Sequence, residues 1–281
     1  MSISLLANTA SLSAQNQLRI SQGSLEKSLE RLSSGQRINR ASDDAAGLGI
    51  SENLKADIRS LAQAQRNAND GISMTQVAEG AMNEMQGIVG RMRELAVQAS
   101  NGTLGDDERG YIQTEFSQLV EEIDRISNVT EFNGTNLLDG TAASGLAMQI
   151  GIHDNADSRM TLTISTLNTS TLGNASAGFI TAQSLSSASG AQSSLATFDA
   201  AIQSLSNARA NVGAVQSRMT IAVSNLSTAQ ENLSAANSRI RDVDVASETA
   251  NMTRYQILTQ AGVAVLGQAN QLPAMALSLL G

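Results

Sequence analysis

An apolar residue recurs every seven positions between residues 198 and 240. A smaller residue, usually alanine, follows three positions after each of them. Large and small residues at two heptad positions form a continuous seam on a helix, against which a second helix can pack closely. The larger residues are Phe198, Leu205, Val212, Met219, Leu226, Leu233 and Ile240, and the smaller ones are Ala201, Ala208, Val215, Ala222, Ala229, Ala236 and Val243. The pattern predicts one helical rod of about 70 Å.

A second long segment carries the same kind of seam between residues 54 and 99. Its two heptad positions hold Leu54, Leu61, Ala68, Thr75, Met82, Val89 and Ala96, and Ala64, Gly71, Ala78, Met85, Met92 and Ala99. We expect this helix and the rod to pack on each other. A shorter amphipathic segment precedes them and is predicted to end near Gly35; its stripe is Leu18, Leu25, Leu29 and Leu32.

A third helix is predicted to begin near Thr103 with a start that resembles a capping box, because three acidic residues follow where a helix N-terminus favours negative charge. Its apolar stripe is Ile112, Phe116, Leu119, Ile123 and Ile126. After it, Asn133-Gly134 and Asp139-Gly140 predict turns, since both dipeptides favour left-handed backbone positions.

Residues 148–152 and 160–164 alternate between apolar and polar side chains on either side of a polar turn, which predicts a β-hairpin. The serine-rich stretch over residues 184–194 is interpreted as a surface loop, with a glycan attachment surface as the alternative. Together these patterns predict a mainly α fold: an elongated antiparallel helical bundle or coiled coil with one small β-hairpin.

Composition narrows the classes of function. The net charge is −8 and no basic footprint appears, so we expect no nucleic-acid partner. The chain has no Trp, two Tyr and four Phe, and therefore few of the anchors typical of ligand pockets. Cysteine is absent, which rules out disulfides. The first residues show no secretory signal pattern, and no apolar run is long enough to span a membrane.

Enzymatic chemistry finds little support in the residues. His153 is the only histidine and lies in the predicted hairpin turn, so neither a His-rich metal site nor a zinc-protease motif can be built. No nucleophile-elbow motif is present, and Gly47-Leu48-Gly49 is too short for a dinucleotide fingerprint. We expect no enzyme activity, no catalytic residues, no cofactor and no metal site.

Several runs of residues, in matching order at both ends of the chain, resemble bacterial flagellin. They are residues 31–51 (RLSSGQRINRASDDAAGLGIS), 65–73 (QRNANDGIS), 93–98 (RELAVQ), 261–271 (AGVAVLGQANQ) and 277–280 (LSLL). Several long motifs are far more specific than one short one, and the resemblance covers nearly the whole chain.

That resemblance implies a structural subunit that polymerises into the filament of the bacterial flagellum for swimming. It further implies export of the unfolded chain through the flagellar secretion channel and addition at the distal tip, so the location would be secreted and extracellular. The partners implied are other copies of the chain in a helical homopolymer, the flagellar cap, the hook-junction proteins and an export chaperone. No membrane partner is implied.

The resemblance also implies layers. Residues 1–43 and 242–281 are expected to form the inner core as terminal helices that become ordered on polymerisation. Residues 44–180, with the long helices and the hairpin, and residues 181–241, the C-terminal rod helix, are expected to form the rod domain. No large outer domain is expected, because only about 30 residues separate the hairpin from the rod.

The terminal stripes are the predicted assembly surface. Apolar residues again recur at seven near the C-terminus, and such thin stripes need neighbours to complete their packing. The residues assigned to assembly are Leu5, Leu258, Val265, Leu272, Leu279 and Leu280. The alternative is ordinary intramolecular helix pairing, which uses the same seams.

Two further sites are predicted. Asn39, Ser42, Asp43 and Asp44 form a polar connector before the second long helix, which is either a helix cap and hinge or, by the resemblance, a spoke between layers that contacts other subunits.

Residues 90–97 resemble the flagellin segment recognised by Toll-like receptors of animal hosts, with Arg91 and Leu95 on the exposed side of the helix and Glu115 on the next helix as the matching positions. The alternative is a solvated face with an ion pair between two helices.

Two other functions stay open at this point. A hook-filament junction protein shares the helical ends but does not form long filaments. An amphipathic protein that lies on membranes also exposes leucine-rich helices, but such helices normally carry Lys and Arg on their polar face, and these ends are poor in both.

Overall fold

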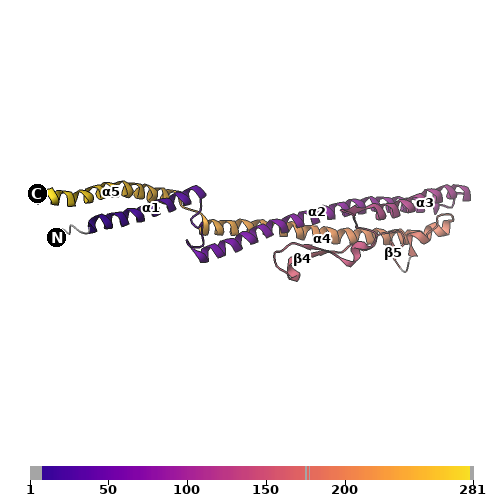
Figure 1. Cartoon of the computed structure of the whole chain (residues 1–281). Coiled ribbons are helices and arrows are strands. Elements are labelled where there is room, and N and C mark those ends of the chain that lie inside the picture. The colour runs from indigo at the N-terminus through magenta and orange to yellow at the C-terminus, as the bar shows by residue number, and fades with distance from the viewer. Residues whose placement is uncertain (1–7, 175, 177, 279–281) are drawn as a thin grey trace. The chain divides into compact units, whose positions relative to one another are not determined.

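The computed structural model describes residues 8–174, 176 and 178–278, and only the backbone of residues 272–278 (Figure 1). The five α-helices of the described chain are α1 (Thr9–Ser34), α2 (Ala45–Ala99), α3 (Asp106–Val129), α4 (Ala188–Arg241) and α5 (Val245–Ser278). The fold is mainly α, as predicted. The chain divides into two compact units, one of residues 1–58 and 231–281 and the other of residues 59–230.

The first unit contains α1 and α5, which lie side by side and antiparallel (Figure 1). Asn8 caps α1 by accepting a hydrogen bond from the backbone N–H of Ser11 at 3.0 Å, and its amide donates to the carbonyl of Ala269 at 2.9 Å. Gly35 ends α1 with a left-handed φ of 70°, a conformation that glycine adopts without a steric penalty. The predicted end of this helix is confirmed.

The second unit holds the apolar core, formed where α2, α3 and α4 pack together (Figure 1). The heptad residues predicted on α2 and α4 supply it: Met82, Met85, Val89, Met92, Phe198 and Leu205 are fully buried. The rings of Phe116 on α3 and Phe198 on α4 meet edge to face with centroids 5.8 Å apart, which adds a favourable aromatic contact. The seams predicted from the sequence are therefore the core.

The start of α3 differs from the prediction. The helix begins after Gly105, and no side chain caps it, so the capping box at Thr103 is wrong. The turn is instead held by the buried Arg109. Its guanidinium donates to the carbonyl of Ala99 at 3.0 Å and to that of Asn101 at 3.1 Å, and so satisfies groups at the C-terminal end of α2.

The strands form three antiparallel pairs in the described chain, so the expectation of a single hairpin is wrong. The predicted hairpin is confirmed as β3 (Leu146–Gln149) with β4 (Arg159–Leu162), with Met148 opposite Met160. The others are β1 (Glu131–Phe132) with β2 (Thr135–Asn136), and β5 (Gly173–Asn174) with β6 (Gly178–Phe179). Two-residue strands are too short to show an alternating pattern.

Short 3-10 turns and loops fill the remaining connections between the described strands and helices: η1 (Thr141–Ser144), η2 (Ala156–Ser158) and η3 (Ile180–Ala182). The serine-rich loop ends earlier than predicted, because α4 begins at Ala188. Ser194 is therefore a buried residue of α4. Its hydroxyl can donate to either of two acceptors, the carbonyl of Gly190 at 2.8 Å or Gln183 Oε1 at 3.0 Å. Serine tolerates a buried helical position when its hydroxyl bonds back to the preceding turn.

Candidate functional site

Small and polar side chains line the contact between α1 and α5. The buried residues of α1 are Ser11, Ser21 and Ser28, and Ser11 Oγ donates to Asn270 Oδ1 at 2.7 Å. A β-carbon built on Gly262 of α5 would lie 3.2 Å from Leu18 Cδ1, so the two helices approach closely there. The inner face of this helix pair therefore combines buried serines with the half-buried Leu18.

Large apolar side chains of the same two helices point outward. Leu258 is 45% exposed and Val265 is 55% exposed. Further exposed residues on these helices are Leu29, which belongs to the predicted stripe, and Leu12, Ile20, Ile257 and Val263, which the sequence reasoning did not single out. We call these exposed apolar residues of α1 and α5 together the assembly surface, because each gains burial only from a partner outside the helix pair. Of the other predicted assembly residues, Leu5, Leu279 and Leu280 lie outside the described residues, as does the side chain of Leu272.

The connector from α1 to α2 is joined by backbone hydrogen bonds to the turn between α4 and α5. Gln36 and Asp242 form an isolated antiparallel bridge. The N–H of Arg37 donates to the carbonyl of Arg241 at 2.6 Å, and the N–H of Val243 donates to that of Gly35 at 3.1 Å. The end of α1 and the start of α5 are thus held next to each other within the first unit.

The four predicted connector residues have distinct places. Asp44 accepts a hydrogen bond from the N–H of Gly47 at 2.8 Å and caps α2, as the cap interpretation predicts. Asp43 instead accepts from the N–H groups of Asn39 and Arg40 at 3.3 and 3.2 Å. The Asn39 amide donates to Ser34 Oγ at 2.8 Å. Ser42 is exposed. Contact of these residues with another subunit stays a prediction.

Asp43 is the titratable group most strongly affected by this arrangement. The pKa of Asp43 is lowered from 3.8 to about 2, chiefly by its hydrogen-bonded ion pair with Lys27 on α1. The two backbone N–H groups lower it further. Its side chain is largely buried while that of Lys27 is half exposed. The carboxylate therefore fixes the connector against α1 at neutral pH.

The residues matched to the immune-recognition segment lie in the second unit. Arg91 on α2 and Glu115 on α3 form an ion pair at 2.8 Å, and both side chains are half exposed. This pair, with Glu94 as a second partner, raises the pKa of Arg91. Leu95 is only 1% exposed and belongs to the core, so its expected position on the exposed side of the helix is wrong. Receptor contact itself stays a prediction.

Comparisons with known proteins bear on both ends of the chain. The family model for the bacterial flagellin N-terminal helical region matches residues 5–143, and that for the C-terminal helical region matches residues 195–280. The chain belongs to the bacterial flagellin family. It is 43% identical to the flagellar filament 30.7 kDa core protein of Treponema maltophilum over 97% of this chain and 98% of that protein.

A flagellin of Halalkalibacterium halodurans is 44% identical to this flagellin-family chain, also over 97% of this chain and 98% of that protein. The crystal structure of Bacillus cereus flagellin aligns with a TM-score of 0.49 at 31% identity, covering 57% of this chain and 88% of that one.

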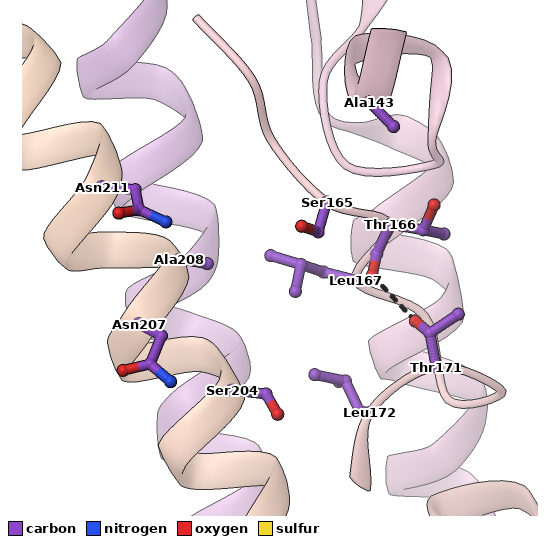
Figure 2. A pocket seen from close by; sticks show the side chains of 10 residues that line it. All are labelled: Ala143, Ser165, Thr166, Leu167, Thr171, Leu172, Ser204, Asn207, Ala208 and Asn211. Carbon is purple, nitrogen blue, oxygen red and sulfur yellow. Dashed lines mark hydrogen bonds between the residues drawn. The ribbon is translucent and has the colours of Figure 1, made fainter. Parts of the chain in front are cut away.

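The second unit of this flagellin-family chain also contains an open cavity of about 490 Å³ (Figure 2). The loop over residues 165–172 faces α4 across it, and Thr171 Oγ1 donates to the carbonyl of Thr166 at 2.8 Å. The lining residues are Ala143, Ser165, Thr166, Leu167, Thr171, Leu172, Ser204, Asn207, Ala208 and Asn211. None of them is titratable, so this cavity offers hydroxyl and amide hydrogen bonds but no acid or base.

No group of three or more His, Cys, Asp or Glu residues in the described parts of the chain is arranged to hold a metal ion. His153 is exposed in the loop between β3 and β4. Among the described residues, no helix has both the length and the apolar character needed to cross a membrane.

Proposed function

We propose that this flagellin-family chain is a structural subunit that polymerises with other copies of itself into the filament of the bacterial flagellum. One observation carries the proposal beyond family membership: α1 and α5 bury serines between them and hold large apolar side chains outward. Such a helix pair leaves its main hydrophobic gain to be made with other chains. The same observation argues against the intramolecular role of Leu258 and Val265.

Burial of this surface favours assembly. Burying one leucine or valine side chain is worth about 1.5–3 kcal/mol. Each added subunit gains this for every residue of its assembly surface that a neighbouring subunit covers. A contact between different surfaces of identical chains that does not close into a ring generates a helical filament. The polymer therefore follows from one repeated interface.

We further propose that residues 1–43 and 242–281 form the inner layer of the filament, and that residues 44–180 and 181–241 form the layer around it. The backbone bridge between Gln36 and Asp242 supports this division, because α1 ends and α5 begins next to it. Terminal helices that become fully ordered only on polymerisation belong to the same proposal, since the assembly surface gains its partners only then.

Export as an unfolded chain, addition at the distal tip of an extracellular filament and contacts with the cap, hook-junction proteins and chaperone complete the proposal. The lack of cysteine supports the route, because an unfolded chain without thiols cannot be cross-linked in transit. A filament subunit needs no catalysis, and we propose no enzymatic activity. No observation favours the hook-filament junction protein.

We also propose that Arg91 and Glu115 can meet a Toll-like receptor of an animal host. Their half-exposed side chains and opposite charges support a polar contact with a protein surface. The alternative is that the two residues serve only their ion pair with each other, between α2 and α3.

The test compares an outward with an inward residue of the same helix. Leu258→Ser is expected to leave the helix content and unfolding of the monomer unchanged but to raise the critical concentration for assembly about tenfold or more, which corresponds to about 1.4 kcal/mol. The matched variant Gly262→Val pushes against Leu18 and is expected to destabilise the monomer. Circular dichroism measures the helix content and unfolding of the monomer, and seeded sedimentation measures the critical concentration for assembly.

If Leu258→Ser lowers the helix content of the monomer while the protein still assembles at the wild-type concentration, Leu258 serves internal pairing and the proposed interface is wrong.

A further inference from the structure

Strand β3 of the β3–β4 hairpin contacts α2 through a hydrogen bond and a close apolar contact, while Leu162 of β4 is buried in the core. The amide of Asn67 donates to the carbonyl of Gln149 at the end of β3, at 3.0 Å. About one helical turn further along α2, a β-carbon built on Gly71 would overlap the sulfur of Met148 and lie 3.0 Å from that of Met219. Two thioethers thus occupy the space that the missing side chain of Gly71 leaves.

Met148 differs from the core methionines in its access to solvent. It is half-buried and lines two adjoining cavities of about 620 and 320 Å³, together with Asp70, Met74 and Phe132. Of the other core methionines of α2 and α4, Met82, Met85, Met92 and Met219 are 0% exposed, and Met74, which lines the same cavities, is 8% exposed. A small oxidant in solvent can therefore approach Met148 through this groove while those four stay covered.

We propose that Met148 is a sulfoxidation site, and that its oxidation releases the β3–β4 hairpin from α2. The oxidant is a hydroperoxide: its terminal oxygen is transferred to the sulfur lone pair, the O–O bond breaks, the thioether becomes a sulfoxide, and the peroxide is reduced to water or an alcohol. No group of the protein has to supply an electron or a proton in the net reaction.

Release follows from the space and polarity around the sulfur. The side facing Gly71 has no room for another atom, because even a β-carbon there would overlap the sulfur. On the groove side, the new oxygen enters a solvent-open cavity lined by Met74, Phe132 and Leu146 together with the polar Asn133 and Thr135. Because a sulfoxide is hydrated far more strongly than a thioether, the oxidised side chain gains stability by turning its oxygen towards water and leaving its contact with Gly71.

Trypsin reports the release of the hairpin directly. Arg159 is the only Lys or Arg between Arg125 and Arg209, and it is the first residue of β4, paired with Gln149. Cleavage after Arg159 requires the local ladder to open, since a protease needs an extended, accessible backbone. Mass spectrometry identifies this cut by the new chain ends at Arg159 and Met160, whichever other sites trypsin also cleaves.

The experiment treats the purified full-length chain with hydrogen peroxide, maps sulfoxides by peptide mass spectrometry and follows tryptic cleavage after Arg159. We expect Met148 sulfoxide to form before sulfoxides of Met82, Met85, Met92 and Met219. We expect peroxide to accelerate the Arg159 cut about 5–30-fold, the change that a loss of one to two kcal/mol of local stability produces. The variant Met148→Leu, which keeps an apolar side chain but lacks sulfur, should show no acceleration.

A second pair of variants tests the attachment without oxidant. Gly71→Ala displaces Met148 and should accelerate the same cut, whereas Gly87→Ala, with open space around its β-carbon on the same helix, should not. Equal acceleration in Met148→Leu and wild type under peroxide, or Met148 left unoxidised while the buried methionines react, overturns the proposal. So does an Arg159 cut that Gly71→Ala leaves unchanged.

Discussion

The ammonium of Lys27 lies 2.7 Å from Oδ1 of Asp43 and joins α1 to the connector that leads into α2. The other carboxylate oxygen of Asp43 accepts from two backbone N–H groups of that connector. One side chain thus fixes both the loop and its position against the helix. A spoke between filament layers requires this kind of rigidity, because subunit contacts are reproducible only if the loop holds one conformation.

The ion pair predicts a specific dependence of stability on pH. Because the pKa of Asp43 is lowered from 3.8 to about 2 in the folded chain, its contribution is fully present above 3.8 and is lost as the pH falls through about 2. Asp43→Asn is expected to lower the free energy of unfolding by about 1 kcal/mol at neutral pH, discounted for the exposed Lys27. The difference from wild type should shrink as the pH falls below 3.8 and vanish only below pH 2.

Urea unfolding followed by circular dichroism at several pH values measures this difference, and Lys27→Met should remove the same pH dependence. A destabilisation by Asp43→Asn that is equally large at neutral pH and near pH 2 would show that the carboxylate charge is not its cause.

Gly47 and Gly49, both near the start of α2, allow the effect of close packing on stability to be measured apart from the effect of helix propensity. A β-carbon on Gly47 would lie 2.8 Å from Cδ1 of the buried Ile38, whereas one on Gly49 meets nothing within 4 Å. Gly47→Ala is therefore expected to destabilise the protein by about 1–3 kcal/mol through overpacking. Gly49→Ala is expected to stabilise it by about 0.5–1 kcal/mol, since alanine favours a helix. Thermal unfolding of both variants measures the contrast, which is refuted if the two substitutions shift Tm in the same direction.

The buried guanidinium at the α2–α3 turn provides another contrast. Arg109→Met leaves the buried Ala99 carbonyl and the Asn101 carbonyl without these donors, and should cost about 1–3 kcal/mol. Arg125→Met removes an exposed partner of Glu122 and should leave the free energy of unfolding unchanged. Chemical denaturation of the two variants is the measurement, and similar losses in both would remove the special role of Arg109.

Arg91 allows receptor recognition to be separated from structure. Because the Arg91–Glu115 pair is half exposed, Arg91→Ala should preserve folding while reducing receptor signalling if the arginine contacts the receptor. Arg93→Ala, which removes another exposed ion pair between two helices, serves as the control. A cell reporter of Toll-like receptor activation measures the response, and unchanged signalling by Arg91→Ala counts decisively against the contact.

Heptad spacing was enough to predict the long helices and the core, because Met82, Met92 and Phe198 repeat with the period of packed helices. It could not show which neighbour covers which face. Leu95 lies outside the α2 seam and is nevertheless buried in the core cluster. The outward direction of Leu258 was likewise hidden, since the buried positions of α1 are serines, which carry no apolar signal.

The short strand pairs and the α3 cap escaped the sequence reasoning for another reason. Two-residue strands carry no period, and Arg109 reaches the end of α2 from a neighbouring helix, which no local capping motif encodes. The Asn133-Gly134 turn did carry a signal, because both residues adopt positive φ values of 51° and 75° between β1 and β2.

Negative-stain electron microscopy of the purified chain, after addition of short filament seeds or ammonium sulfate, tests the central claim most directly. The account predicts long, uniform filaments, because the outward apolar surface of α1 and α5 gains its partners only from other copies. Monomers that stay soluble with intact ends under these conditions would contradict it, and would leave the terminal heptads as internal packing of a junction protein.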